Sequence, residues 1–289
     1  MTALFALATS LLWGLADFGG GLLTRRFPAL TVVVVSQTLA VLVLGTVVAA
    51  TGAWSEAGPQ LWYAVAAGAV GPAAMLCFYK ALALGPMGVV SPLGSLGVVV
   101  PVSVGLLVGD RPGLLQFAGI AVAVLGVVLA GGPELRGAPV QRQAVLLTLV
   151  AAFGFGAVMA LISEASTTLT GLFLALFVQR VTNVAVGSGA LWLSVKRGGR
   201  ALPEGGGGLR AVAVAIPALA FVGLADVAAN GTYALAAQRG PVTIAAVLAS
   251  LYPVVTALAA RGVLKERLRA VQAAGAGLAL VGTVLLATG

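Results

Sequence analysis

The sequence contains no histidine and a single cysteine, Cys77. Without histidine, imidazole metal clusters and histidine-based catalytic triads are excluded, and one cysteine allows no disulfide within the chain. The glycine run at 205–208 is not followed by the Lys-Ser/Thr pair of a P-loop, so ATP cannot be the energy source within this chain. We therefore expect no enzyme, no cofactor and no metal site.

Charged side chains are also scarce, at 8% of the 289 residues, while 60% of the residues are hydrophobic. An ordinary soluble domain carries about 25% charged residues, so this chain could not cover the surface of a soluble protein. Its apolar runs are continuous over about 20 residues, the length of a transmembrane helix, and they do not alternate as the strands of a barrel would. The sequence predicts an all-α, multi-pass membrane protein with ten transmembrane helices.

The formal net charge of +8 does not indicate nucleic acid as a partner, because no basic stripe is interleaved with aromatic residues. Most basic residues lie in the short gaps between apolar runs, where such residues fix the orientation of a membrane protein. The chain starts with an apolar stretch that no basic segment precedes, so we expect the first helix to be retained rather than cleaved. The expected surroundings are the lipid bilayer of the cell membrane.

The apolar runs predict ten helices in two groups of five. The first group is expected at residues 3–23, 30–51, 61–83, 87–108 and 113–131, and the second at 143–163, 169–195, 211–236, 241–262 and 268–288. A polar linker at 132–142 separates the groups. We therefore predict one five-helix repeat over residues 1–131 and a second over residues 143–289.

Short motifs recur between the two groups in the same order. The matching elements are Gly85-Pro86 with Gly240-Pro241, Ser95-Leu96 with Ser250-Leu251, and Asp110, Gln116 and Gly119 with Glu266, Gln272 and Gly275. The first two are displaced by 155 residues and the last by 156. Because five is odd, the copies would insert in opposite orientations, as inverted repeats of secondary transporters do. The alternative is a chance match, since helices rich in Ala, Val, Gly and Leu resemble one another easily.

These motifs resemble the EamA domain of the drug/metabolite transporter superfamily over nearly the whole chain. The first copy carries Tyr79-Lys80-Ala81-Leu82, Gly85-Pro86, Ser95-Leu96, Gly109-Asp110 and glycines from Gly119 to Gly126; the second carries Tyr233-Ala234-Leu235, Ser250-Leu251-Tyr252-Pro253, Lys265-Glu266-Arg267, Gly275 and Gly282. Asp110 stands where the family usually has glutamate, and the proline near Ser95 is displaced to Pro101. The resemblance implies a ten-helix transporter of small molecules.

Asp17 is the first candidate for a functional side chain, because a charge within a span costs about 2.5–3.5 kcal/mol on insertion scales. It shares one face of the first helix with Ser10 and Trp13. The functional interpretation is a carboxylate that faces a cavity and binds a proton or a cationic group. The structural alternative is a partner for an interior arginine or dipole.

A second polar stripe consists of Asp226, Asn230 and Tyr233, which are spaced to share one face of the eighth helix. An acid, an amide and a phenol together favour a water-lined cavity, with Asp226 on its wall. Asn230 could instead be retained for a hydrogen bond between helices.

The seventh helix carries Gln179, Arg180 and Asn183. Gln179 and Asn183 share a face, while Arg180 points about 100° away. Arg180 could bind a carboxylate or phosphate of the solute through its fork of donors, or it could neutralise an interior aspartate. Gln37 occupies the matching place in the second helix, so the charged version is present only in the second half.

Several aromatic residues could line a cavity or could simply pack within the bundle: Trp13, Phe78, Tyr79, Phe153, Phe155, Tyr233 and Tyr252. Three prolines, Pro92, Pro101 and Pro253, interrupt the fourth and ninth helices. Broken helices of transporters present backbone groups to the substrate, although such prolines can also be tolerated kinks.

The sequence as a whole favours a secondary transporter that moves a small polar or amphipathic metabolite or drug by alternating access. A proton gradient or the solute gradient itself would drive it. The alternatives are a lipid-carrier flippase and a membrane scaffold without transport activity. The sequence does not specify an oligomeric state, and a monomer is compatible with it.

Basic residues predict the orientation in the membrane. Thirteen of them lie in or beside the loops that follow the odd-numbered helices, against two in the loops after even-numbered ones. The positive-inside rule therefore places the odd loops in the cytoplasm and both termini outside. The family resemblance implies the opposite arrangement, with both termini inside.

Overall fold

The computed structural model describes residues 2–98, 100, 113–131, 141–165, 168–203, 208–239, 248–249, 251–265 and 270–288. Its α-helices are α1 (Thr2–Thr24), α2 (Ala29–Thr51), α3 (Leu61–Leu84), α4 (Met87–Gly94), α6 (Leu114–Gly131), α7 (Arg142–Ala165), α8 (Leu169–Lys196), α9 (Gly208–Gln238), α11 (Tyr252–Leu264) and α12 (Ala270–Thr288). Two short 3-10 helices, η1 (Ala53–Glu56) and η2 (Ser95–Val98), complete the elements. The prediction of an all-α protein is confirmed for these residues, which include no strand.

Each predicted helix coincides with one observed helix, but the fourth is not continuous. The α-helix ends at Gly94 and is followed by the 3-10 helix η2, where the hydroxyl of Ser95 donates to the carbonyl of Pro92 at 2.7 Å. The interruption predicted from the prolines of this helix is therefore present, two residues after Pro92, whereas a continuous α-helix over 87–108 is not. In the ninth, α11 begins at Tyr252, with Pro253 in its first turn. Pro101, Asp110, Gly240, Ser250 and Glu266 lie outside the described residues.

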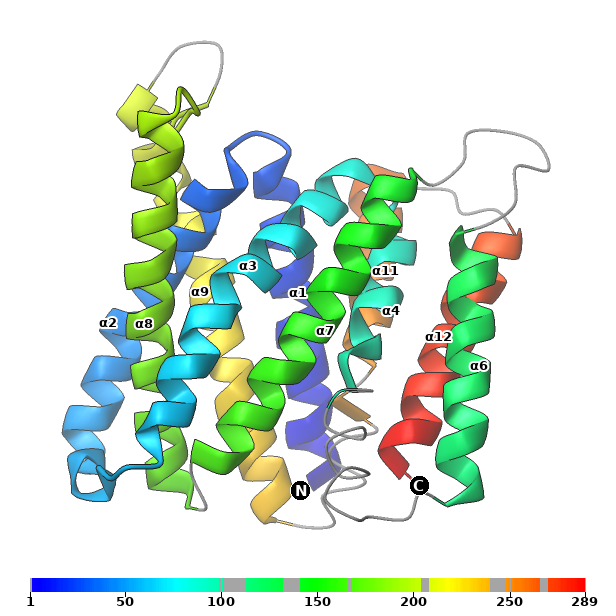
Figure 1. Ribbon diagram of the computed structural model, residues 1–289, viewed down its shortest axis with the longest axis horizontal. Coiled ribbons are helices and arrows are strands. Elements are labelled where there is room, and N and C mark those ends of the chain that lie inside the picture. Colours follow the sequence, from blue (N-terminus) through cyan, green and yellow to red (C-terminus); the bar gives the residue numbers. More distant parts are fainter. Residues whose placement is uncertain are drawn as a thin grey trace.

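Six helices are long and apolar enough to cross a membrane, namely α1, α2, α3, α7, α8 and α9, and shorter apolar helices accompany them. This is a multi-pass membrane protein. The α1–α2 turn, the end of α8 and the start of α9 lie at one end of the bundle, and α1 starts and α12 ends at the other (Figure 1). Trp54, Trp62 and Trp192 are exposed near helix ends, where indoles anchor spans at the membrane surface.

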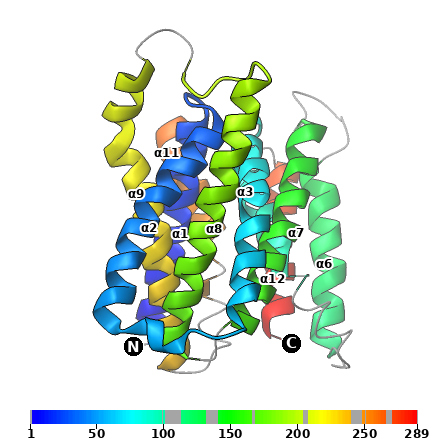
Figure 2. The same ribbon diagram turned by 60° about the vertical axis from the view of Figure 1, so that its left-hand side comes forward.

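The helices pair mainly across the two halves of the chain. α1 packs against α9 and α11, while α3 packs against α7 and α8. α2 lies against α8 and α9, and α6 lies against α12. The pair α2/α8 forms one edge of the bundle and the pair α6/α12 the other (Figures 1 and 2). Between these two edges lie α1, α3, α4, α7, α9 and α11 (Figure 1).

Glycines bring several of these helix pairs into backbone contact. A Cβ added to Gly68 of α3 would lie 2.5 Å from the carbonyl oxygen of Gln179 in α8, and one added to Gly223 of α9 would overlap the carbonyl of Ser36 in α2. Lipid tails give no hydrophobic drive for helices to associate, so close approach through small residues contributes much of the packing energy.

A second set of glycines joins the first helix of each half to the broken helix of the other half. A Cβ on Gly14 of α1 would lie 2.6 Å from the carbonyl oxygen of Tyr252, and one on Gly156 of α7 would overlap the carbonyl of Gly97. The hydroxyl of Thr256 also donates to the carbonyl of Gly14 at 3.0 Å. These contacts fix α1 firmly on α11.

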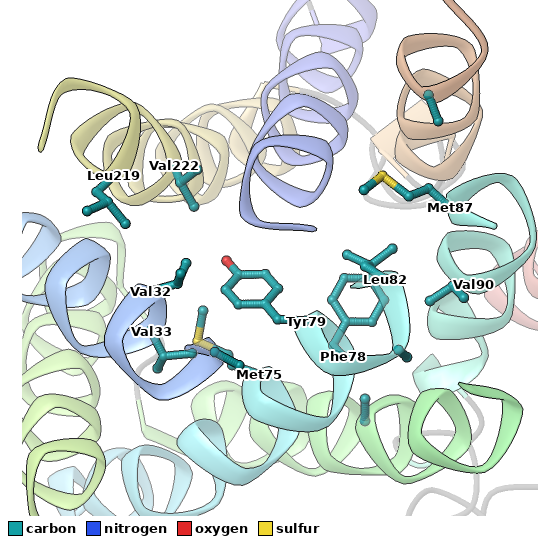
Figure 3. Close-up of a cluster of buried hydrophobic side chains, with 14 residues drawn as sticks. Val32, Val33, Met75, Phe78, Tyr79, Leu82, Met87, Val90, Leu219 and Val222 are labelled. Carbon is teal, nitrogen blue, oxygen red and sulfur yellow. The ribbon is translucent and has the colours of Figure 1, made fainter. Parts of the chain in front are cut away.

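A buried apolar cluster lies beside the C-terminal half of α3. Tyr79 and Phe78 of α3 pack there with Val32 of α2 and Val222 of α9. Figure 3 shows the Tyr79 hydroxyl pointing away from α3, toward the side where Val222 lies. Tyr79 therefore reaches from the apolar core toward the polar residues of the neighbouring helices.

Candidate functional site

Helix α8 carries three buried polar side chains into the bundle. Gln179, Arg180 and Asn183 are 4%, 7% and 1% exposed. Although Arg180 points away from the face shared by the other two, all three are covered, because α2 packs on one side of α8 and α3 on the other. The hydrophobic residues of α8 that face outward are exposed, as Val181 and Val186 illustrate. Polar residues thus occupy the face of this helix that the bundle shields from lipid.

Arg180 joins three helices through its guanidinium group. Nη2 lies 2.6 Å from Oδ2 of Asp226 in α9, and Nη1 donates to Oε1 of Gln37 in α2. A planar fork of donors suits such simultaneous contacts. Of the two roles considered for Arg180, the structure places it against an interior aspartate, and that aspartate is Asp226 rather than Asp17.

Asn230 follows Asp226 by one turn on α9. Its amide nitrogen donates to the main-chain carbonyl of Asp226 at 2.7 Å and lies 3.5 Å from the Oδ1 atom of the same residue. The first contact holds Asn230 on its own helix, and the second orients the carboxylate that faces Arg180. Two members of the predicted stripe, Asp226 and Asn230, are therefore joined by hydrogen bonds, whereas the third, Tyr233, packs against Trp13.

Asp17 has no hydrogen bond or ion pair with any part of the chain that the structure describes. It is half-buried on α1, which packs against α9. Its carboxylate is close enough to that of Asp226 for electrostatic repulsion between them. Because Arg180 is engaged with Asp226, Asp17 has no positively charged partner among the described residues.

Aromatic rings surround the same stretch of α1. Trp13 lies between Tyr233 of α9 and Tyr252 of α11, with both ring centroids 6.0 Å from its own. One turn beyond Asp17, Gly20 leaves space for the ring of Tyr79, because a Cβ there would lie 2.5 Å from that ring. The Tyr79 hydroxyl interacts electrostatically with the charges of Asp17, Asp226 and Arg180.

Four buried polar atoms of this region lack a hydrogen-bond partner within the described parts of the chain. They are Nε2 of Gln37, Oε1 of Gln179, Nε of Arg180 and Oδ1 of Asn183. Buried polar groups are nearly always hydrogen-bonded to protein, water or ligand. Two donors and two acceptors are thus available in one small region to a polar molecule.

The eleven predicted site residues form two adjoining groups. One is the polar group on α2, α8 and α9, made of Gln37, Gln179, Arg180, Asn183, Asp226 and Asn230. The other is the aromatic group around α1, made of Trp13, Asp17, Tyr79, Tyr233 and Tyr252.

Other aromatic candidates lie elsewhere. Phe78 and Phe155 meet edge to face in the apolar core, with ring centroids 5.5 Å apart, and Phe153 is 57% exposed. The described residues include no group of three or more His, Cys, Asp or Glu side chains that could hold a metal ion.

Some contacts near the site involve residues that sequence reasoning did not single out. Thr9 of α1 and Thr232 of α9 form a hydrogen bond of 2.9 Å between their hydroxyls, and the Asn183 amide contacts the sulfur of Met75 at 3.9 Å. The available signal was position: Thr9 lies one helical turn before Trp13, and Thr232 directly precedes Tyr233.

Comparison with known proteins gives concordant results. A sequence model of the EamA-like transporter family matches residues 1–132 and again residues 142–288. An uncharacterized transporter in the cobO 3' region of Sinorhizobium sp is 30% identical over 130 residues, covering 40% of this chain and 92% of that protein. A solved structure titled only "Crystal structure of protein" is similar over 98% of this chain and 95% of its own, with a TM-score of 0.56 and 17% identity. At that identity the likeness shows the fold alone.

Proposed function

This chain belongs to the EamA-like transporter family, and we propose that it is a secondary transporter that moves a small polar or amphipathic solute across the cell membrane by alternating access. The observation that carries this proposal is the placement of interior charge. Asp17 and Gln37 from the first half meet Arg180 and Asp226 from the second. Charged groups inside spans are costly and mark substrate or ion pathways.

We further propose that the two halves are inverted repeats, with residues 1–131 and 143–289 as the units and 132–142 as the linker. The packing of the helices supports this arrangement. Exchanging the halves turns the contact of α1 with α9 into that of α7 with α3, and the contact of α2 with α9 into that of α8 with α3. The pairs α2/α8 and α6/α12 are each exchanged with themselves.

The glycine contacts support the same exchange at the level of single residues. Gly14 meets the carbonyl of Tyr252, and Gly156 meets the carbonyl of Gly97. The two glycines are 142 residues apart and the two carbonyl residues 155, so each residue has its counterpart in the other half.

The contacts of Gly68 and Gly223 are also exchanged when the two halves are exchanged. Gly223 follows Gly68 by 155 residues, and their partners Ser36 and Gln179 are 143 residues apart. The equivalence of Ser36 and Gln179 makes Gln37 the counterpart of Arg180, so these two contacting residues lie on the proposed two-fold axis.

In this mechanism the site lies where the halves meet, and the two halves rock against each other around it. Arg180 holds α2, α8 and α9 together, whereas Asp17 stands unpaired on α1 between α9 and α11. A solute that neutralises or hydrogen-bonds to these groups would replace the water that an open site admits. An unpaired carboxylate also argues against a membrane scaffold, whose interior charges would all be paired.

The test is a solute screen with the purified chain in proteoliposomes, followed by two variants. Asp17→Asn and Asp226→Asn each remove a charge at nearly constant size, and Glu164→Gln makes the same type of change at an exposed acid of α7. We expect flux of at least one solute, retained in Glu164→Gln and reduced at least tenfold in one of the other two. No flux of any solute in either direction would contradict a transport function.

The same assay tests proton coupling. We expect transport by the parent chain to vary between pH 6 and 8, and we expect the Asp17→Asn variant to lose this variation. Normal transport by both aspartate variants across this range would show that neither carboxylate couples proton movement to the solute.

A further inference from the structure

We propose that Asp17, Trp13, Tyr233 and Tyr252 form a subsite for the positively charged group of an organic cation, such as a quaternary ammonium. This inference rests on the proposed transport function, because it specifies the class of solute that the site would carry. It assigns the aromatic group around α1 to the cationic end of the solute.

When Asp17 is ionised, it has no positively charged partner among the residues that the structure describes. Arg180 already contacts Asp226 and Gln37, and the group acting on Asp17 electrostatically is another carboxylate, that of Asp226. The other basic residue of the central helices near this level, Lys80 of α3, is exposed. A carboxylate in a span is stabilised by a counter-charge, and a bound cation supplies one.

Within the described parts of the chain, the groups that interact with Asp17 from the neighbouring helices carry no positive charge. α9 contributes Asp226, α11 contributes Tyr252, and α3 contributes Tyr79. The positive charge of α8, on Arg180, is held by its ion pair with Asp226. The surroundings therefore favour a cation over an anion at this position.

The aromatic rings add the second element of cation recognition. Trp13 precedes Asp17 by one helical turn, so the two side chains share a face of α1. The Tyr233 ring is tilted by 33° and the Tyr252 ring by 74° relative to the indole, both with centroids at 6.0 Å. The two tyrosine rings thus lie at different angles beside the indole that shares the helix face of Asp17. Ring faces attract the methyl groups of a quaternary ammonium through the ring quadrupole.

All three rings are half-buried rather than sealed in the core. Their phenol groups come from α9 and α11, which α1 contacts directly. Tyr252 also stands at the start of α11, where the broken ninth helix begins its described α-helical part. The subsite is thus built on one helix of the first half and two of the second, so a change in their relative position would alter its geometry.

The test uses two quaternary ammonium ions, choline and benzyltrimethylammonium, and 3,3-dimethylbutan-1-ol, which is the neutral carbon counterpart of choline. Binding to the purified, detergent-solubilised chain is measured by isothermal titration calorimetry. We expect at least one of the two cations to bind and the neutral alcohol to bind at least tenfold more weakly. Equal affinity for choline and its neutral counterpart, or no binding of either cation, would overturn the proposal.

Variants then assign the binding to the subsite. Asp17→Asn should weaken cation binding at least tenfold, and Trp13→Leu about fivefold, the order expected for one cation–π contact. Asp17→Glu keeps the charge and should bind within about threefold of the parent chain. Glu164→Gln, at an exposed acid, should bind as the parent does. Full binding in Asp17→Asn would overturn the proposal; size-exclusion chromatography of each variant excludes misfolding.

Counterflow in proteoliposomes separates this inference from the proposed function. Transport of a neutral or anionic solute without any cation binding would overturn the cation subsite and leave the transport function standing. Asp17-dependent cation binding without flux of any solute would support the subsite and contradict transport.

Discussion

Replacing Arg180 by glutamine would leave two carboxylates facing each other inside the bundle. In the parent chain, Arg180 Nη2 lies 2.6 Å from Asp226 Oδ2, and the two side chains are 8% and 22% exposed. Asp17 is close enough to Asp226 to repel it. The Arg180→Gln variant keeps an amide that can face Gln37, but it provides no counter-charge for either aspartate.

The expected cost follows from the geometry of the pair. At 2.6 Å and an effective dielectric constant of about 20, the Coulomb attraction is about 6 kcal/mol, and desolvation offsets much of it. Removing one member of a buried pair typically costs about 3–5 kcal/mol, because the other charge is left unpaired. We expect Arg180→Gln to fall in this range.

Replacing Asp226 instead of Arg180 should cost less stability. In Asp226→Asn, Arg180 retains Gln37 as an acceptor and can turn its charge toward Asp17, so we expect a cost of about 1–3 kcal/mol. The double variant places two neutral amides together and should cost less than the sum of the single variants. The difference, a coupling of about 2–3 kcal/mol, is at the upper end for contacting residues.

The assay is unfolding of the purified chain in mixed micelles with increasing SDS, followed by circular dichroism. Glu164→Gln serves as the control, because that acid is exposed at the end of α7. Single-variant costs that add within about 0.5 kcal/mol would refute the ion pair as a source of stability. A greater loss of stability in Asp226→Asn than in Arg180→Gln would refute the role of Asp17 as a replacement partner for the charge of Arg180.

Two other predictions concern packing and orientation. Gly223→Ala would press a Cβ onto an α2 carbonyl and should cost about 1–3 kcal/mol, seen as a lower midpoint of thermal unfolding. Gly189→Ala, with open space around it, should be neutral or stabilising. Equal midpoints for the two variants would contradict the close contact between α2 and α9. With Cys77 replaced by alanine, an impermeant thiol reagent applied to intact cells should label Ser55→Cys and spare Gly205→Cys. The reverse pattern would place both termini inside.

The extents of the long helices could be predicted because they are set by the lengths of apolar runs. Leu61–Leu84 and Leu169–Lys196 each lie within one residue of the predicted limits, since polar residues cluster where a span meets water. The break after Gly94 could not be predicted from apolar length, although Pro92 indicated an interruption of this helix. At the break, the Ser95 hydroxyl donates to Pro92 and contacts Thr283 of α12 at 3.1 Å, and hydropathy does not predict contacts between such distant residues.

For the candidate site, the sequence could predict which residues share a face of one helix, but not which residues of different helices contact each other. The spacing of Asp226 and Asn230 places them on one face of a helix whatever its neighbours are. The choice of Asp226 over Asp17 as the partner of Arg180 depends on how α8 crosses α2 and α9. Helix crossings are fixed by small residues such as Gly68 and Gly223, and their partners lie more than 100 residues away in the sequence.

The contact between Gln37 and Arg180 has a consequence for the history of the gene. Under the proposed two-fold axis, these positions descend from one residue of a five-helix ancestor that assembled as an antiparallel homodimer. A side chain on that axis meets its own copy, so an arginine there would have faced a second arginine and a glutamine a second glutamine. Charge could enter this position at low cost only after duplication and fusion let the copies mutate separately. If the two halves are such repeats, the Arg180–Asp226 pair is younger than the fold that holds it.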